Sequence, residues 1–262
     1  MTVLIKLGGS LVTDKARARS FRRATAQSLA QQVVELRAAR PEIDLVIGHG
    51  SGSFGHFEAA QHGTAKGVYS ADDRLGLAKV GAVAAELSQL ILGELLAAGL
   101  PVIRFQPSSL LTTRDRQLFS LTVTPLTLAL EQQLIPLVHG DIALDSKIGG
   151  TIISTEALFA AMVEPLQARQ IILLGDVDGV LDEDGAPIAI ITPESFPQIA
   201  PLLGGSGGVD VTGGMLQKVS EMISLVEAHP GLEVIIANGK VNDILLALLV
   251  SGAPIGTRIC AE

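Results

Sequence analysis

Short apolar runs alternate with longer stretches of helical periodicity along the whole chain. The apolar runs predict strands at 3–7, 44–47, 102–105, 135–138, 170–174, 233–236 and 257–259. Helical spacing predicts helices over 23–40, 75–99, 154–164, 215–228 and 241–250, the first with Leu29, Val33 and Leu36 on one face. Strands and helices in alternation predict an α/β fold, with an open, mainly parallel central sheet sandwiched between helices.

Five of the predicted strands end in small or acidic residues. The segments that follow these strands lie at 8–9, 48–52, 139–141, 175–178 and 238–239. In open α/β sheets, ligands bind beyond the carboxyl ends of the strands, so we expect the functional site at this edge. No repeat, low-complexity tract or linker interrupts the chain, and we therefore expect a single domain over 1–262.

The amino-acid composition favours a folded domain and argues against nucleic-acid binding and a membrane span. Hydrophobic residues make up 48% of the chain and charged residues 18%, which is typical of a folded domain with a substantial core. The net charge of −8 argues against nucleic-acid binding, although basic residues cluster over 15–23. That cluster suits a solvated helix start or a rim that attracts phosphate. The most apolar long stretch, 81–100, contains polar interruptions, so we expect no membrane span.

The N-terminal sequence lacks the pattern of a signal peptide, and Cys260 is the only cysteine. We therefore expect a cytoplasmic enzyme or binding protein.

The stretch GHGSGSFGH at 48–56 has the densest run of glycines. Gly50, Gly52 and Gly55 match the spacing G-x-G-x-x-G, and Asp72 and Asp73 follow about 20 residues later, as in dinucleotide-binding proteins. No apolar strand precedes these aspartates, so the required βαβ unit is missing. The stretch also lacks the lysine of a P-loop and the spacing of a nucleophile elbow. Two interpretations remain: a nest of backbone N–H groups that binds an anion, or a tight turn that needs positive φ.

The position of three lysines favours an anion with several phosphates. Lys6 comes just before a pair of glycines, Lys15 lies just past them, and Lys218 follows another glycine pair at a predicted helix start. Phosphoryl transfer requires positive charge around the moving group. A lysine taken alone is more often a surface residue, so only the combination of lysines with glycine turns indicates phosphate binding.

Several motifs together resemble the amino-acid kinase superfamily. They are KLGGS at 6–10, GDVDGV at 175–180 and DVTGGM at 210–215 with Lys218. The second glycine turn and the His-Gly-Asp at 139–141 resemble the isopentenyl phosphate kinases within it. That resemblance implies ATP-dependent phosphorylation of isopentenyl phosphate to isopentenyl diphosphate. It also implies a homodimer, an N-terminal acceptor-binding half over about 1–165 and a C-terminal nucleotide-binding half over about 166–262.

The resemblance implies roles for individual residues. The catalytic group is Lys6, Lys15, His56 and Lys218. The nucleotide-binding group is Gly8, Gly9, Ser10, Asp176, Asp178, Gly179, Gly213 and Lys218. The acceptor-binding group is Gly50, Gly52, Ser53, Gly55, His56, Gly140 and Asp141. Mg²⁺ is expected to bind mainly through ATP phosphates and water, and we identify no protein ligand for it.

The chain departs from the family pattern at Glu156. An aspartate that organises the catalytic lysines is usual there, and Glu156 has one more methylene. Two other functions therefore stay open: a fosfomycin or other phosphonate kinase of the same fold, and a non-catalytic nucleotide-binding regulator. We interpret His49 as a structural residue beneath the glycine turn and His56 as the histidine that contacts the acceptor phosphate. Small residues at Gly81, Ala82, Ala84 and Ala85 suit either a pocket for a five-carbon tail or close helix packing.

Overall fold

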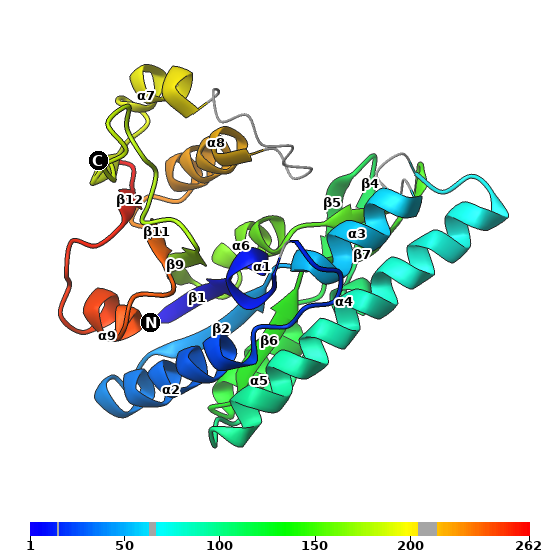
Figure 1. Ribbon diagram of the computed structural model, residues 1–262, viewed down its shortest axis with the longest axis horizontal. Coiled ribbons are helices and arrows are strands. Elements are labelled where there is room, and N and C mark those ends of the chain that lie inside the picture. The colour runs from blue at the N-terminus through cyan, green and yellow to red at the C-terminus, as the bar shows by residue number, and fades with distance from the viewer. Residues whose placement is uncertain (15, 63–66, 204–213) are drawn as a thin grey trace.

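The main sheet confirms the predicted fold class. The computed structural model describes residues 1–14, 16–62, 67–203 and 214–262, and within them the sheet has eight strands (Figure 1). Their order is β10 (Ile190–Ile191), β12 (Thr257–Ile259), β11 (Glu233–Asn238), β9 (Ala168–Gly175), β1 (Thr2–Leu7), β2 (Asp44–His49), β6 (Ile135–His139) and β3 (Val102–Arg104). Neighbouring strands pair in parallel, except that β12 runs antiparallel to β11.

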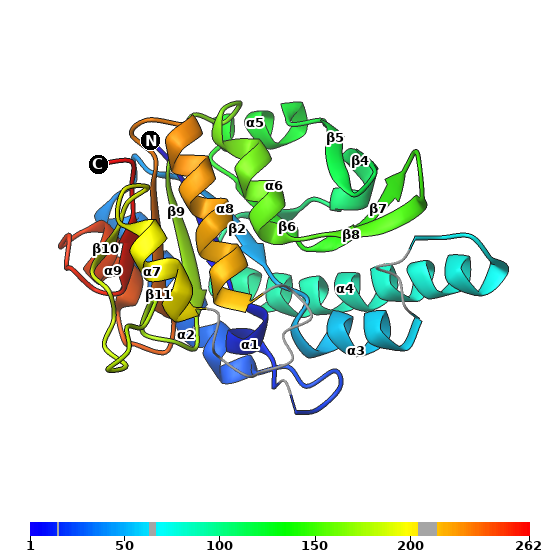
Figure 2. The same ribbon diagram turned by 90° about the horizontal axis from the view of Figure 1, so that it is seen from above.

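Helices cover both faces of this sheet, as the alternation of strands and helices predicts. Val3 and Ile5 of β1 pack into a core with α2 (Arg23–Ala39), α4 (Ala71–Ala97) and α9 (Ile244–Leu249). Leu4 points to the opposite face and packs into a second core with α5 (Thr124–Glu131), α6 (Thr155–Val163) and α8 (Gly214–Ala228). Figure 2 shows α6 and α8 across this second face. The remaining helices are α1 (Gly9–Val12), α3 (Gly52–His62), α7 (Phe196–Leu203) and a 3₁₀ turn, η2 (Pro107–Ser109).

A second, four-stranded sheet was not predicted. It has the order β5 (Gln117–Leu121), β4 (Leu111–Arg114), β7 (Asp141–Asp145) and β8 (Gly149–Ile153). In β7 the usual pattern is reversed, because Asp141 and Asp145 are buried whereas Leu144 is exposed. A strand that buries carboxylates and exposes an aliphatic side chain gives no apolar run for sequence reasoning to detect.

Helix α4 begins four residues earlier than predicted. Ser70 accepts a hydrogen bond from the Asp73 backbone N–H, and the Asp73 carboxylate accepts one from the Ser70 backbone N–H, which completes a capping box. Asp72 and Asp73 therefore belong to the first turn of a helix and not to a nucleotide-binding βαβ unit. Among the described helices, α4 alone is long and apolar enough to cross a membrane, but Leu87 and Ile91 anchor it in the core, so this is weak evidence for a span.

The Asp145 carboxylate ties the second sheet together. It accepts hydrogen bonds from the backbone N–H groups of Asp115, Arg116, Lys147 and Ile148, at 2.8–3.1 Å. Burial raises the pKa of Asp145, but these backbone hydrogen bonds outweigh burial and hold the pKa well below its usual range. The ionised side chain therefore joins the β4–β5 and β7–β8 connections.

We expect Asp145→Asn to lower the free energy of unfolding by about 2–4 kcal/mol at pH 7, because it weakens a buried hydrogen-bond network. The folded-state pKa lies below the unfolded value, so the stabilisation is complete above about pH 4 and is lost as pH falls further. Urea denaturation between pH 3 and 7 measures both effects. Asp44→Asn, at the exposed start of β2, is the control. An equal loss in the two variants would contradict the role of Asp145.

Candidate functional site

The first glycine turn lies where β1 ends and α1 begins. The Gly8 N–H donates to the Leu174 carbonyl of β9 at 2.7 Å, which fixes the turn against the neighbouring strand. A Cβ atom at Gly9 would lie 2.5 Å from the Gly52 nitrogen, in the second glycine turn. The two turns therefore meet backbone to backbone, and Gly9 is required because no side chain fits between them.

The second glycine turn lies at the end of β2, beside the first. The Gly50 N–H donates to the Leu7 carbonyl at 3.1 Å, and a Cβ atom at Gly50 would come within 3.0 Å of the Gly9 nitrogen. Gly52 has φ +49°, in the left-handed region, and begins α3, on which Ser53, Gly55 and His56 follow. The interpretation of GHGSGSFGH as a turn that needs positive φ is confirmed at Gly52, whereas anion binding by its N–H groups stays a prediction.

Lys6 precedes the first turn in the sequence and lies close to the second. A Cβ atom at Gly50 would be 3.8 Å from the Lys6 Cε atom, so the lysine side chain passes beside the second turn. Its ammonium group forms an ion pair with the Glu156 carboxylate, and both side chains are almost buried. Burial raises the pKa of Glu156, but Lys6 and then Lys218 lower it, so the net pKa lies below the usual value. Glu156 thus forms an ion pair with Lys6, and the charge of Lys218 also favours its ionised form.

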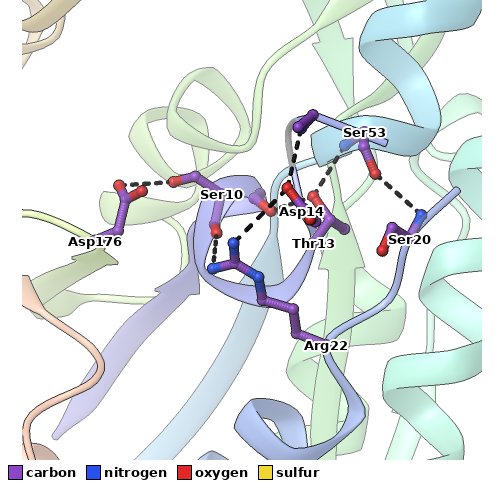
Figure 3. A network of polar contacts seen from close by, with 9 residues as sticks. Ser10, Thr13, Asp14, Ser20, Arg22, Ser53 and Asp176 are labelled. Atoms are coloured by element: carbon purple, nitrogen blue, oxygen red, sulfur yellow. Dashed lines mark hydrogen bonds and ion pairs between the residues drawn. The ribbon is translucent and has the colours of Figure 1, made fainter. Parts of the chain in front are cut away.

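Among the predicted nucleotide-binding residues, Asp176, Asp178 and Gly179 follow the end of β9, and the first glycine turn follows the neighbouring strand β1. The Ser10 hydroxyl of the first turn donates to the Asp176 carboxylate at 2.9 Å (Figure 3). The Asn238 side-chain amide donates to the Asp178 carboxylate at 2.7 Å, beside a cavity of about 450 Å³. Gly179 follows directly and packs against Thr257. Two residues assigned to this site, Lys15 and Gly213, lie outside the described residues.

The two histidines of the second turn occupy different environments. His56 is half-buried on α3, whereas His49 is fully buried at the end of β2, as expected for a structural residue. The His49 ring stacks on that of His139, with centroids 5.2 Å apart. Burial lowers the pKa of His49 to about 3 and that of His139 to about 4, helped respectively by His139 and by Arg104. Both imidazoles are therefore neutral at pH 7.

Gly140 and Asp141 lie beneath the second turn. The Gly140 N–H donates to the His49 carbonyl at 3.1 Å, which couples the ends of β6 and β2. The Asp141 carboxylate is 1% exposed and accepts from the Gln106 amide at 2.6 Å and the Ser108 N–H at 3.0 Å. Burial raises the pKa of Asp141. These contacts hold the carboxylate within the protein, and direct contact of Asp141 with an acceptor stays a prediction.

Sequence reasoning missed two threonines that join the parts of the site. The Thr155 hydroxyl donates to the His49 carbonyl at 2.6 Å, which connects the start of α6 to the second turn. The Thr13 hydroxyl contacts both glycine turns. No periodicity or motif spacing distinguishes these threonines, because their roles depend on contacts with residues 40 to 106 positions away.

Known proteins of one family resemble this chain in sequence and in fold over most of its length. The model of the amino acid kinase family matches residues 1–238. The isopentenyl phosphate kinase of Methanocaldococcus jannaschii is 30% identical over 99% of this chain and 98% of its own length. That of Haloferax volcanii is 34% identical over 85% of this chain and 88% of its own. A solved structure of isopentenyl phosphate kinase, 26% identical, superposes with a TM-score of 0.82 over 99% of this chain and 100% of that one.

Proposed function

This chain belongs to the amino acid kinase family, and from that premise we propose that it transfers the γ-phosphoryl group of ATP to isopentenyl phosphate, giving isopentenyl diphosphate. The observation that carries the proposal is the position of Lys6. Its side chain starts just before the first glycine turn and passes beside the second, and an ion pair with Glu156 holds its ammonium group. This is the arrangement needed when two phosphate groups must approach despite their mutual repulsion.

The chemistry of the acceptor explains why the site requires no general base. A phosphate monoester has a second pKa of about 6 and is largely dianionic at pH 7, so its oxygen attacks without losing a proton. The protein must instead align the two phosphates and offset their charge. The first turn would hold the ATP phosphates through its backbone, and Lys6 would bridge to the acceptor phosphate. His56 would donate a hydrogen bond to that phosphate from α3.

An apolar surface beside the second turn suits an isopentenyl tail. Ile142 of β7 pairs across the second sheet with Ile152 of β8, which places both on one face with the exposed Leu144. This face lies against α4, where a Cβ atom at Gly81 would be 3.1 Å from Ile142. Gly81 therefore serves close packing of α4 on the sheet, and the exposed Leu144 on the same face would contact the tail.

Three further features belong to the proposal. We expect Mg²⁺ to neutralise ATP oxygens. Among the described residues, no cluster of three His, Cys, Asp or Glu forms a metal site, so phosphate oxygens and water would be its main ligands.

We expect a homodimer, supported by exposed Ile103 on the edge strand β3 and exposed Leu96 on α4, and light scattering tests it. We expect a cytoplasmic location, where ATP is abundant, and cell fractionation tests it.

The decisive test is an acceptor panel with purified protein, ATP and Mg²⁺. We expect turnover of isopentenyl phosphate, with kcat/KM at least about 100-fold above that for fosfomycin or inorganic phosphate, since only isopentenyl phosphate fits both the phosphate turn and the apolar face. Faster phosphorylation of fosfomycin would support a phosphonate kinase instead. ATP binding by calorimetry with no transfer to any acceptor would support a nucleotide-binding regulator and overturn the proposal.

A further inference from the structure

We propose that Thr13 is a positioning residue that holds the nucleotide turn and the acceptor turn at the separation required for phosphoryl transfer. This inference deepens the proposed function and rests on it for the identity of the two turns. Thr13 is the residue that ends α1, six positions after β1, and its side chain is fully buried. Its single hydroxyl group contacts both turns at once (Figure 3).

The two contacts have opposite polarity, so one hydroxyl satisfies both. The Thr13 hydroxyl donates to the Gly9 carbonyl of the first turn at 2.6 Å. The same oxygen accepts the Ser53 backbone N–H of the second turn at 2.9 Å. Among side chains of similar size, only threonine and serine offer a strong donor and a strong acceptor on one atom. The Thr13 hydroxyl therefore forms a one-atom bridge across the seam where Gly9 and Gly52 meet.

Ser53 makes two further hydrogen bonds, both with residues that follow Thr13 in the chain. The Ser20 backbone N–H donates to the Ser53 hydroxyl at 3.3 Å (Figure 3). The Arg19 N–H donates to the Ser53 carbonyl at 3.4 Å. Arg22, two residues on, donates to the Ser10 carbonyl of the first turn at 3.2 Å. Residues 19–22 thus contact both turns. Thr13, which precedes them, is the fully buried residue that contacts the same two turns.

The geometry predicts how the bridge affects the reaction. Each turn would bind its own phosphate group through local backbone N–H groups, so neither affinity requires the bridge. The distance between donor and acceptor atoms does depend on it, and a misplacement of about 1 Å can cost about 100-fold in rate. Loss of the hydroxyl should therefore lower kcat much more than it weakens the binding of either substrate.

The test uses Thr13→Val, Thr13→Ser and the full-length enzyme. Valine has nearly the same shape, but its methyl group cannot lie 2.6–2.9 Å from polar backbone atoms and pushes the turns apart. We expect kcat of Thr13→Val to fall about 10- to 100-fold, with dissociation constants for ADP and for isopentenyl phosphate within about threefold of wild type. Thr13→Ser should stay within about threefold of wild-type kcat, since it keeps the hydroxyl.

A matched control separates positioning from general stability. Thr113 of β4 is also fully buried and hydrogen-bonded, at 3.3 Å to the Leu144 carbonyl, but it lies in the second sheet. Thr113→Val should lower the melting temperature with kcat little changed. A wild-type kcat in Thr13→Val, or a loss of kcat that Thr13→Ser does not rescue, would overturn the proposal.

A readout independent of activity keeps the test decisive if the proposed acceptor is wrong. Hydrogen exchange of the Ser53 amide in the ligand-free protein should speed up at least about tenfold in Thr13→Val and stay near wild type in Thr13→Ser. If wild-type enzyme phosphorylates no acceptor, the proposed function fails, and the exchange result alone decides the bridge. Unchanged exchange in Thr13→Val contradicts it.

Discussion

Lys6→Met is expected to lower kcat by at least about 1,000-fold, the largest effect of any single substitution proposed for this chain. Lys6 would supply positive charge beside the two glycine turns, and the loss of one such electrostatic contact to a transition state costs about 100- to 1,000-fold. The substitution also leaves the Glu156 carboxylate almost buried beside the phosphates without its ion-pair partner. That negative charge would add repulsion at the place where charge must be neutralised.

The loss of an ion-pair partner also reduces stability, so activity and folding must be separated. Breaking a buried pair from one side costs about 3 kcal/mol or more, whereas replacing both partners by neutral groups costs much less. We therefore expect Lys6→Met alone to lower the melting temperature and Lys6→Met with Glu156→Gln to recover most of it. Steady-state kinetics should show that the double variant remains inactive. Recovery of turnover together with stability would refute a catalytic role for Lys6.

His56→Ala is expected to lower kcat/KM for isopentenyl phosphate about 100- to 1,000-fold while the dissociation constant for ATP stays within about threefold of wild type. His56 lies on α3, one turn of helix after Gly52, and it would donate a hydrogen bond to the acceptor phosphate. Hydrogen bonds to a charged group are stronger than neutral ones, and this bond would tighten as charge shifts during transfer. The nucleotide turn does not contain His56, so ATP affinity should survive.

The control for this variant is His229→Ala, which removes a histidine at the C-terminal end of α8, close to the start of β11 and away from the strand ends that carry the site. Initial rates at varied isopentenyl phosphate and calorimetry with ATP provide both quantities. If His56→Ala keeps the kcat/KM of the His229 variant, His56 does not bind the acceptor. A matched loss in ATP affinity would place His56 in the nucleotide site instead.

Sequence reasoning predicts the site from the glycines and charged residues that mark the ends of the strands. The resemblance to the amino-acid kinases assigns Gly9 to one turn and Gly50 and Gly52 to the other, and the structure brings these turns into backbone contact. The role of Glu156 stayed open, because a sequence does not tell whether one extra methylene can be accommodated. The fold places α6 so that the Glu156 carboxylate meets the Lys6 ammonium group, which answers the question.

The second sheet marks the limit of pattern-based prediction. β7 buries Asp141 and Asp145 and exposes Leu144, so its hydrophobic pattern contradicts its burial. Four backbone N–H groups compensate the burial of Asp145, two from its own β7–β8 connection and two from the distant β4–β5 connection. Such compensation is invisible until the chain has folded.

The sequence by itself determined the class of fold, the main strands and the glycine turns, because these depend on local periodicity and on residues whose lack of a side chain is itself a signal. Only the tertiary structure decided that the two turns touch, that Glu156 holds Lys6, that His49 stacks on His139, and that Thr13 bridges the seam. Each of these depends on distances between residues far apart in the chain. Such distances follow from how helices and sheet pack, and no local pattern encodes them.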